Sequence, residues 1–297
     1  MKVGFIGLGA MGLPMAANLV RKSFTVSAFD LDAAKVAQLA ELGAHAASSS
    51  AEAARGKDVV FTMLPETRHV EQVVLGPAGI LATMERGSVL VDMSTIDPSG
   101  TDRVAAACAD RGVRFSDCPV GRLVSHAERG ESLFMIGGDD EVVSTIDPLL
   151  HAMGTAFYRC GPAGMGTRMK IVNNYMLLVT AQVVSESLVL GSKLGLGPEI
   201  IKEVTAGTTA TNGQLQIAFP SKVLKGDIEP GFTIDLTFKD LSLAMTAAAQ
   251  SRIGLPVGAA AHAVVGAARA TKYAAKDFSA LLDYASELAG IEPPRLA

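Results

Sequence analysis

One lysine and two asparagines share a face of a predicted apolar helix that begins at a glycine turn. The turn is Gly164-Met165-Gly166, and the polar residues are Lys170, Asn173 and Asn174. Residues three and four apart project from the same side of a helix, so this cluster either faces solvent or lines a pocket. An amine at the mouth of an apolar helix handles a proton near neutral pH if burial lowers its pKa. Lys170 is therefore a candidate acid or base, and Asn174 a candidate for holding the reacting oxygen.

A glycine motif near the start of the chain predicts a dinucleotide site. Gly7-Leu8-Gly9-Ala10-Met11-Gly12 lies between a predicted strand and a predicted helix. Gly7 permits a tight turn, Gly9 lets the backbone approach a pyrophosphate, and Gly12 allows close packing of helix on strand. The next strand ends at Asp30. An acid there accepts hydrogen bonds from the adenosine ribose and repels a 2′-phosphate, which predicts NAD rather than NADP; Asp32 is the alternative acid.

Two further strand ends belong to the same predicted pocket. Ligands in open α/β sheets bind beyond the carboxyl ends of the strands. Leu64 and Pro65 follow one such strand and are candidates for the wall of the ribose site. Thr95 follows the next strand, and we expect it near the nicotinamide and the substrate. Ordinary strand-ending turns are the alternative interpretation of both segments.

The order of predicted elements indicates an α/β fold, with a doubly wound Rossmann-type sheet domain followed by an all-α C-terminal domain. Strands alternate with helices up to about residue 160, and long helical runs follow. We therefore expect an NAD-binding domain at 1–162 and an all-helical substrate and dimerisation domain at 163–297, joined by a long interdomain helix at about 167–193. The expected strands are 3–6, 25–29, 58–63, 88–93, 113–117, 133–136 and 156–158, and the first expected helices are 11–22 and 33–42.

Composition narrows the classes of function. The chain has 297 residues, 49% hydrophobic and 19% charged, with a net charge of -4. Such a chain lacks the basic excess typical of nucleic-acid or anionic-membrane binding, so we expect neither partner. Cys108, Cys118 and Cys160 form no CxxC pair, and the five histidines show no metal spacing, so we expect no metal and a reducing, cytoplasmic compartment. The apolar character of the long helix predicts a homodimer or homotetramer.

Several ordered motifs together resemble the β-hydroxyacid dehydrogenase family, which includes 3-hydroxyisobutyrate dehydrogenase. They span nearly the whole chain: Gly7 to Gly12 with Pro14-Met15-Ala16-Ala17-Asn18-Leu19, Met93-Ser94-Thr95, Asp117-x-Pro119-Val120, Gly164-x-Gly166 with Lys170 and Asn174, and Phe238-Lys239-Asp240-Leu241. The resemblance implies NAD-dependent hydride transfer with Lys170 catalytic, Asn173 and Asn174 contacting substrate, and Lys239 near the cofactor. A non-catalytic dinucleotide-binding protein is the alternative of another class.

The segment after Val120 bears on the substrate. Most of the family has Ser-Gly-Gly there, and this chain has Gly121-Arg122-Leu123. The guanidinium of Arg122 matches the oxygens of a carboxylate or sulfonate, so we expect a small anionic substrate. This segment resembles the branch that reduces 3-sulfolactaldehyde to 2,3-dihydroxypropane-1-sulfonate, although Leu177 stands where that branch is expected to carry a hydroxyl. Oxidation of 4-hydroxybutyrate or 3-hydroxyisobutyrate, or reduction of succinic semialdehyde, stays open, and His126 in the same loop has no assigned role.

Overall fold

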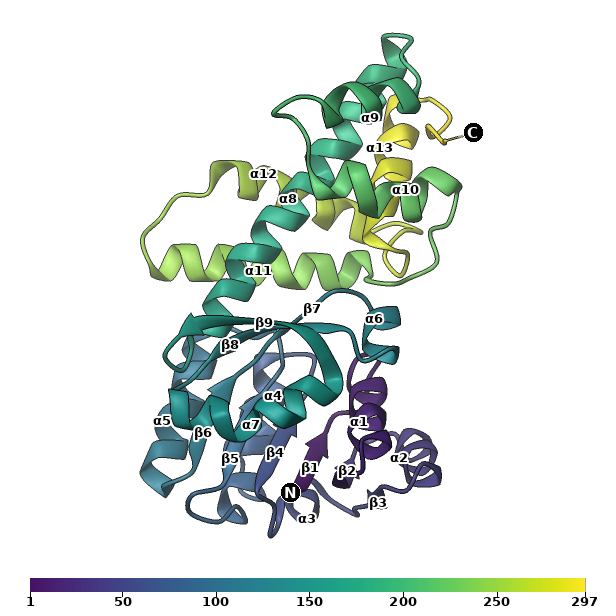
Figure 1. The fold of residues 1–297 in the computed structure, drawn as a ribbon. Helices are drawn as coiled ribbons and strands as arrows, with labels where there is room; N and C mark the ends of the chain where they lie inside the picture. Colours follow the sequence, from purple (N-terminus) through teal and green to yellow (C-terminus); the bar gives the residue numbers. More distant parts are fainter. Residues whose placement is uncertain (297) are drawn as a thin grey trace. The chain divides into compact units, whose positions relative to one another are not determined.

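The computed structural model describes residues 1–296, which form two compact units, one of residues 1–170 and one beginning at Ile171. The first unit is an α/β sheet and the second is helical (Figure 1). Helix α8 (Met165–Lys193) is continuous across the boundary, so its first turn belongs to the first unit and the rest to the second.

A mostly parallel sheet forms the first unit. The strand order is β3-β2-β1-β4-β5-β6-β8-β7, with β9 paired to β8. Only the pairs that join β8 to β6 and to β7 are antiparallel among the described pairs. The strands are β1 (Lys2–Ile6), β2 (Thr25–Phe29), β3 (His45–Ala46), β4 (Val59–Thr62), β5 (Val89–Asp92), β6 (Arg114–Asp117), β7 (Val120–Gly121), β8 (Ser132–Gly137) and β9 (Gly154–Gly161).

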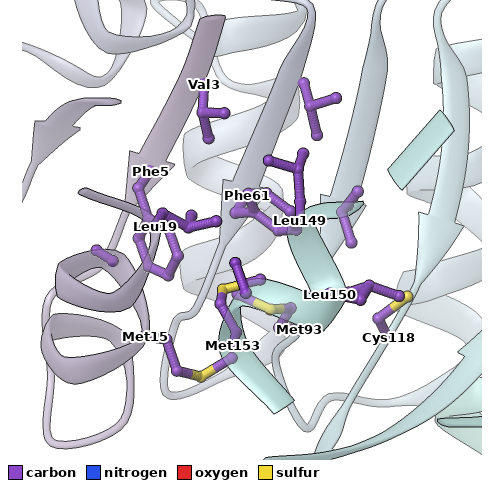
Figure 2. Packing of buried hydrophobic residues seen from close by; sticks show 14 of the residues in the cluster. Val3, Phe5, Met15, Leu19, Phe61, Met93, Cys118, Leu149, Leu150 and Met153 are labelled. Atoms are coloured by element: carbon purple, nitrogen blue, oxygen red, sulfur yellow. The ribbon is translucent and has the colours of Figure 1, made fainter. Parts of the chain in front are cut away.

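Helices cover both faces of this sheet, because its central strands are apolar at successive positions. On β4, Val59 and Phe61 join one core cluster and Val60 joins the other. Figure 2 shows the first cluster, in which Met15 and Leu19 of α1 and Met153 of α7 lie around Phe61 of the sheet. The helices of this unit are α1 (Gly12–Arg21), α2 (Ala33–Glu41), α3 (Ser50–Ala54), α4 (Thr67–Leu75), α5 (Pro98–Arg111), α6 (Val124–Glu128) and α7 (Asp140–Met153), with the short η1 (Ile80–Ala82).

The described residues of the second unit form helices joined by turns and loops, with a single bridge between Thr233 and Asp277 in place of a sheet. Two clusters of buried aliphatic and aromatic side chains form its core, and both include residues of α8. After α8 its helices are α9 (Pro198–Ala206), η2 (Gln214–Ala218), α10 (Phe219–Ser221), η3 (Val223–Lys225), α11 (Ile234–Gln250), α12 (Pro256–Arg269), η4 (Phe278–Ala280) and α13 (Leu281–Ala289).

The predicted fold class is confirmed, and all seven expected strands are present: six lie within one residue of the expected ends, and β9 begins two residues earlier and ends three residues later than expected. The two strands that sequence reasoning missed, β3 and β7, are two residues long, too short for any periodic pattern. Helix α8 begins at Met165, two residues before the expected start. Its length and composition would also suit a membrane span, and 44% of its most apolar stretch is buried within the molecule.

Candidate active site

The glycine turn between β1 and α1 has the backbone that a dinucleotide requires. Gly7 has φ of +96°, and its N–H donates to the carbonyl of Phe29 at 3.0 Å. A Cβ on Gly12 would overlap the carbonyl oxygen of Gly7 and lie 3.3 Å from the ring of Phe5, so packing requires glycine there. A Cβ on Gly9 would meet no described atom within 4 Å. The space at Gly9 is therefore not used by the protein's own packing, which fits close approach by a pyrophosphate.

Asp30 stands at the end of β2 and supports this turn. Its carboxylate accepts from the N–H of Leu8 at 2.5 Å and from the N–H of Asp32 at 2.8 Å. Asp32 instead caps α2, accepting from the N–H of Ala34 at 3.0 Å. A hollow of about 430 Å³ adjoins Asp30, with walls from Phe29, Val36 and other residues of β2, α2 and β3. Asp30 thus joins the glycine turn to the edge of a hollow, while Asp32 is occupied by its own helix.

A buried carboxylate fixes the two strand-end segments predicted to line the pocket. Asp92 accepts from the hydroxyl of Thr62 at 2.9 Å and from both the N–H and the hydroxyl of Ser94, at 3.1 and 2.6 Å. The Ser94 hydroxyl in turn accepts from the N–H of Leu64 at 2.9 Å. Burial raises the pKa of Asp92 to about 6, against the lowering effect of these hydrogen bonds. Leu64 and the half-buried Thr95 are thereby held at adjacent strand ends.

Helix α8 carries the candidate catalytic lysine, its sixth residue, to the first residue of β7. Lys170 is half-buried, and its Nζ donates to the carbonyl of Val120 at 2.7 Å. The buried carboxylate of Asp117 accepts from the N–H of Gly164 and from the N–H of Thr167, each at 2.6 Å. Sequence reasoning named Asp117 only as part of a motif. The missed signal is an acid that ends a strand whose last three residues are buried.

Arg122 adopts the left-handed conformation, with φ of +72°, and its side chain is exposed. Its Nη1 donates to the carbonyl of Glu131 and to the hydroxyl of Thr155 at 3.0 Å. Within residues 1–296 these contacts use one nitrogen of the guanidinium, which leaves Nε and Nη2 for an anion. His126 lies in the neighbouring α6, where its Nδ1 is buried and forms no hydrogen bond among the described residues.

The asparagines belong to a buried polar chain in the second unit. Asn173 donates its Nδ2 to Asn174 Oδ1 at 3.0 Å, and Asn174 donates its Nδ2 to Asp240 Oδ2 at 2.6 Å. Lys239 pairs with the other carboxylate oxygen of Asp240 at 3.0 Å. Asn174 and Asp240 are both at least 95% buried, so the face is not a solvated one. Leu177 lies next to both core clusters of this unit and is not part of the polar chain.

The predicted site residues therefore fall in two groups. Those of the first unit are Lys170, Arg122, Thr95, Leu64, Pro65, the glycine turn from Gly7 to Gly12 and Asp30, while Asn173, Asn174 and Lys239 lie in the second. The open space at Gly9 and the carboxylate of Asp30 beside the glycine turn fit a nicotinamide dinucleotide. Among residues 1–296 no group of three His, Cys, Asp or Glu side chains has the geometry of a metal site.

Comparison with protein families divides the chain at nearly the place where α8 begins. Residues 2–161 match the NAD-binding domain of 6-phosphogluconate dehydrogenase. Residues 164–285 match the family described as the NAD-binding domain of NADP-dependent 3-hydroxyisobutyrate dehydrogenase. Both matches agree with the oxidoreductase chemistry expected from the glycine turn and Lys170.

Individual relatives match along nearly the full chain. The 3-sulfolactaldehyde reductase of Escherichia coli is 38% identical over 289 residues, 97% of each chain. The 2-(hydroxymethyl)glutarate dehydrogenase of Eubacterium barkeri is 37% identical over 290 residues, 98% of this chain and 96% of the relative. A structure of 3-hydroxyisobutyrate dehydrogenase from Mycobacterium tuberculosis with L-serine has a TM-score of 0.90 and 32% identity, covering 95% of this chain and 98% of the other.

Proposed function

Because the chain belongs to the 3-hydroxyisobutyrate dehydrogenase family of β-hydroxyacid dehydrogenases, we propose that it interconverts a small anionic aldehyde and its hydroxy acid with NAD. The first-choice substrate is 3-sulfolactaldehyde, reduced to 2,3-dihydroxypropane-1-sulfonate. The observation that carries this choice is Arg122, a cation that directly follows β7, the short strand whose Val120 carbonyl accepts from Lys170. The family excludes the competing idea that the chain is only a binding protein.

Lys170 supplies the proton that the reduction consumes. Bound NADH supplies a hydride, and the carbonyl oxygen of the aldehyde must then take up a proton. The Nζ of Lys170, held by Val120, donates it, and in the reverse direction the same amine accepts the hydroxyl proton. Asn174, one helical turn further along α8, holds the reacting oxygen, with its amide oriented by Asp240.

Replacing Lys170 by alanine tests this role. We expect kcat to fall by about 10²- to 10⁴-fold, the usual contribution of a positioned acid, with NADH binding unchanged within about twofold. Lys193→Ala, at the far end of the same helix, is the matched control and should keep wild-type turnover. Full turnover by the Lys170 variant would refute the mechanism.

The charge and conformation of Arg122 support the anionic substrate. Its left-handed backbone lies at a position where most of the family has glycine, the residue that adopts this conformation most readily, and here that position carries a guanidinium. Two parallel N–H bonds to a sulfonate or carboxylate orient the substrate as well as bind it. Leu177 does not weaken the proposal, because its side chain packs against the apolar core of the second unit.

A substrate panel on wild type and Arg122→Ala tests the anion. Sulfolactaldehyde, succinic semialdehyde and an uncharged aldehyde of similar size are compared with NADH at fixed pH. We expect Arg122→Ala to lower kcat/KM for the anions at least tenfold, about 1.4 kcal/mol, and to leave the uncharged aldehyde unchanged. Arg129→Ala, an exposed arginine paired with Glu131, is the control. Equal or better turnover of succinic semialdehyde by wild type would reject sulfonate in favour of 4-hydroxybutyrate chemistry.

The proposed cofactor preference is NAD over NADP. Asp30 and Asp32 stand at the end of β2, and Leu31 between them is 94% exposed. The one cation in residues 29–37 is Lys35, which lies 3.8 Å from Asp32. Two carboxylates with one partly committed amine repel a 2′-phosphate. We expect Asp30→Ser to lower the ratio of kcat/KM with NADH to kcat/KM with NADPH at least tenfold. An unchanged ratio would show that Asp30 does not select the cofactor.

The exposed side of α8 supports a homodimer or homotetramer. Val172, Met176, Val183 and Leu190 are 48 to 64% exposed and recur at four- and seven-residue intervals, which is the spacing of a helix-packing stripe. We propose that a second copy covers this stripe in the cytoplasm, where the three free cysteines remain reduced. Sedimentation of Leu190→Asp against wild type tests this; an unchanged mass would reject the stripe as the interface.

A further inference from the structure

Asp117 holds the beginning of α8 with both of its carboxylate oxygens. Oδ1 accepts from Gly164 N–H and Oδ2 accepts from Thr167 N–H, each at 2.6 Å. The first N–H groups of a helix have no partner within the helix and carry its positive dipole end, so a carboxylate there is strongly favoured. Asp117 is 0% exposed; burial raises the pKa of its carboxyl, and the hydrogen bonds from the N–H groups of Thr167 and Gly164 oppose this by favouring the charged form.

The same turn is also fixed sterically against the ends of β6 and β8. A Cβ on Gly166 would overlap the carbonyl oxygen of Met135 and lie 2.6 Å from the carbonyl oxygen of Asp117. A Cβ on Gly137 would overlap Asp117 Oδ1 and lie 2.8 Å from the nitrogen of Gly166. The backbone of the turn thus touches the backbone of two strands, and no side chain can be placed between them.

Lys170 lies three residues beyond Thr167, within one turn of the clamped amide. Its Nζ reaches Val120, which follows Asp117 by three residues on the same strand-end segment. Both contacts lie wholly within the first unit, which also holds the glycine turn. Asp117 binds the start of α8, and Val120, three residues later, binds the amine of Lys170. The short segment from Asp117 to Val120 therefore fixes where the Lys170 amine lies relative to the start of α8.

We infer that Asp117 is a positioning residue for proton transfer: its carboxylate clamps the first turn of α8 and thereby places the Lys170 amine. This inference rests on the proposed role of Lys170. It assigns no contact between Asp117 and substrate or cofactor. It explains why an acid is placed at a buried strand end, where a polar group of any kind would otherwise cost stability.

The test compares Asp117→Asn with Asp102→Asn. The first change keeps the shape of the side chain, but one N–H of the helix then faces an amide NH₂ instead of an oxygen. The second removes an exposed carboxylate that holds the same turn through the side chain of Arg168, at 2.7 and 3.0 Å, and is the matched control. Turnover is measured per NADH-binding site, so that unfolded protein is not counted, together with the solvent deuterium isotope effect on kcat.

We expect Asp117→Asn to lower kcat roughly ten- to a hundredfold, the usual cost of a small displacement of a catalytic group, and to raise the isotope effect. Asp102→Asn should match wild type in both. Asp117→Ser, whose hydroxyl oxygen still accepts one N–H bond, gives an intermediate kcat and serves where Asp117→Asn yields no folded protein. Turnover per site within twofold of wild type in Asp117→Asn, or a loss with an unchanged isotope effect, would overturn the inference.

Lys170→Ala separates this inference from the proposed function. Full turnover by Lys170→Ala removes the proton-transfer role, and the role of Asp117 falls with it. If Lys170→Ala is inactive while Asp117→Asn is fully active, the proposed function stands and only the positioning role of Asp117 is wrong.

Discussion

The glycine motif serves both the packing of the first unit, through Gly12, and the binding of the cofactor, through Gly9. Replacing each of these glycines by alanine should separate the two roles. A methyl group at Gly12 would overlap the carbonyl oxygen of Gly7 and press on Phe5, both in the packed core of the first unit. Overpacking of this kind costs about 1–3 kcal/mol. For a unit of 170 residues that corresponds to a fall in Tm of roughly 2–12 °C.

A methyl group at Gly9 meets no described atom within 4 Å, and Gly9 does not have the positive φ that alanine avoids. Alanine there restricts the unfolded chain, so Tm should stay level or rise slightly, by the equivalent of about 0.4–1 kcal/mol. The same methyl group would stand where the backbone must approach the pyrophosphate. A steric cost of about 1–3 kcal/mol raises the Kd for NADH roughly 5- to 150-fold.

Thermal unfolding without cofactor and NADH titration by fluorescence, run on both variants, test the pair. The expected result is a crossed pattern, with Gly12→Ala losing stability and Gly9→Ala losing cofactor affinity at full stability. An equal loss of Tm in Gly9→Ala and Gly12→Ala, or NADH binding by Gly9→Ala within twofold of wild type, would refute the assignment of separate roles to the two glycines.

Three further changes test the supports of the site. Asp240→Ala removes the buried partner of Asn174 and Lys239 and should cost about 3 kcal/mol in urea unfolding, with a raised substrate KM; a loss below about 1 kcal/mol contradicts the buried network. The folded pKa of Asp92, about 6, lies above its unfolded value of 3.8. The free energy of unfolding of the protein therefore falls as pH rises from about 4 to about 6, because Asp92 then ionises while buried. Asp92→Asn should therefore gain up to about 3 kcal/mol relative to wild type across that range, and a difference independent of pH is the contrary result. Leu177→Ser should lower stability by about 2 kcal/mol without improving KM for sulfolactaldehyde, whereas a lower KM would make position 177 part of the substrate site.

The fold was predictable because its signals are local. Apolar strand runs, glycine turns and the switch from strand to long helical patterns each depend on a few neighbouring residues, and they placed seven strands within three residues and the start of α8 within two. The short strands β3 and β7 escaped because their two residues pair only after neighbouring strands are in place. The placement of Lys170 and Asn174 on one helix was predictable for a related reason, since their spacing is local, and the catalytic role of Lys170 stays a prediction.

The partners of these residues were decided by the tertiary structure alone. Nothing in the spacing of Asp117, Asp92 or Asp240 says that the first caps α8, the second fixes Leu64 through Ser94, and the third orients Asn174. Each of these contacts joins positions separated by 30 to 66 residues, except the short step from Asp92 to Ser94. The sequence by itself determined which groups are proposed to perform the chemistry. Which buried carboxylates hold them was set by the fold, because a hydrogen bond of 2.6 Å between distant segments exists only once the backbone has brought them together.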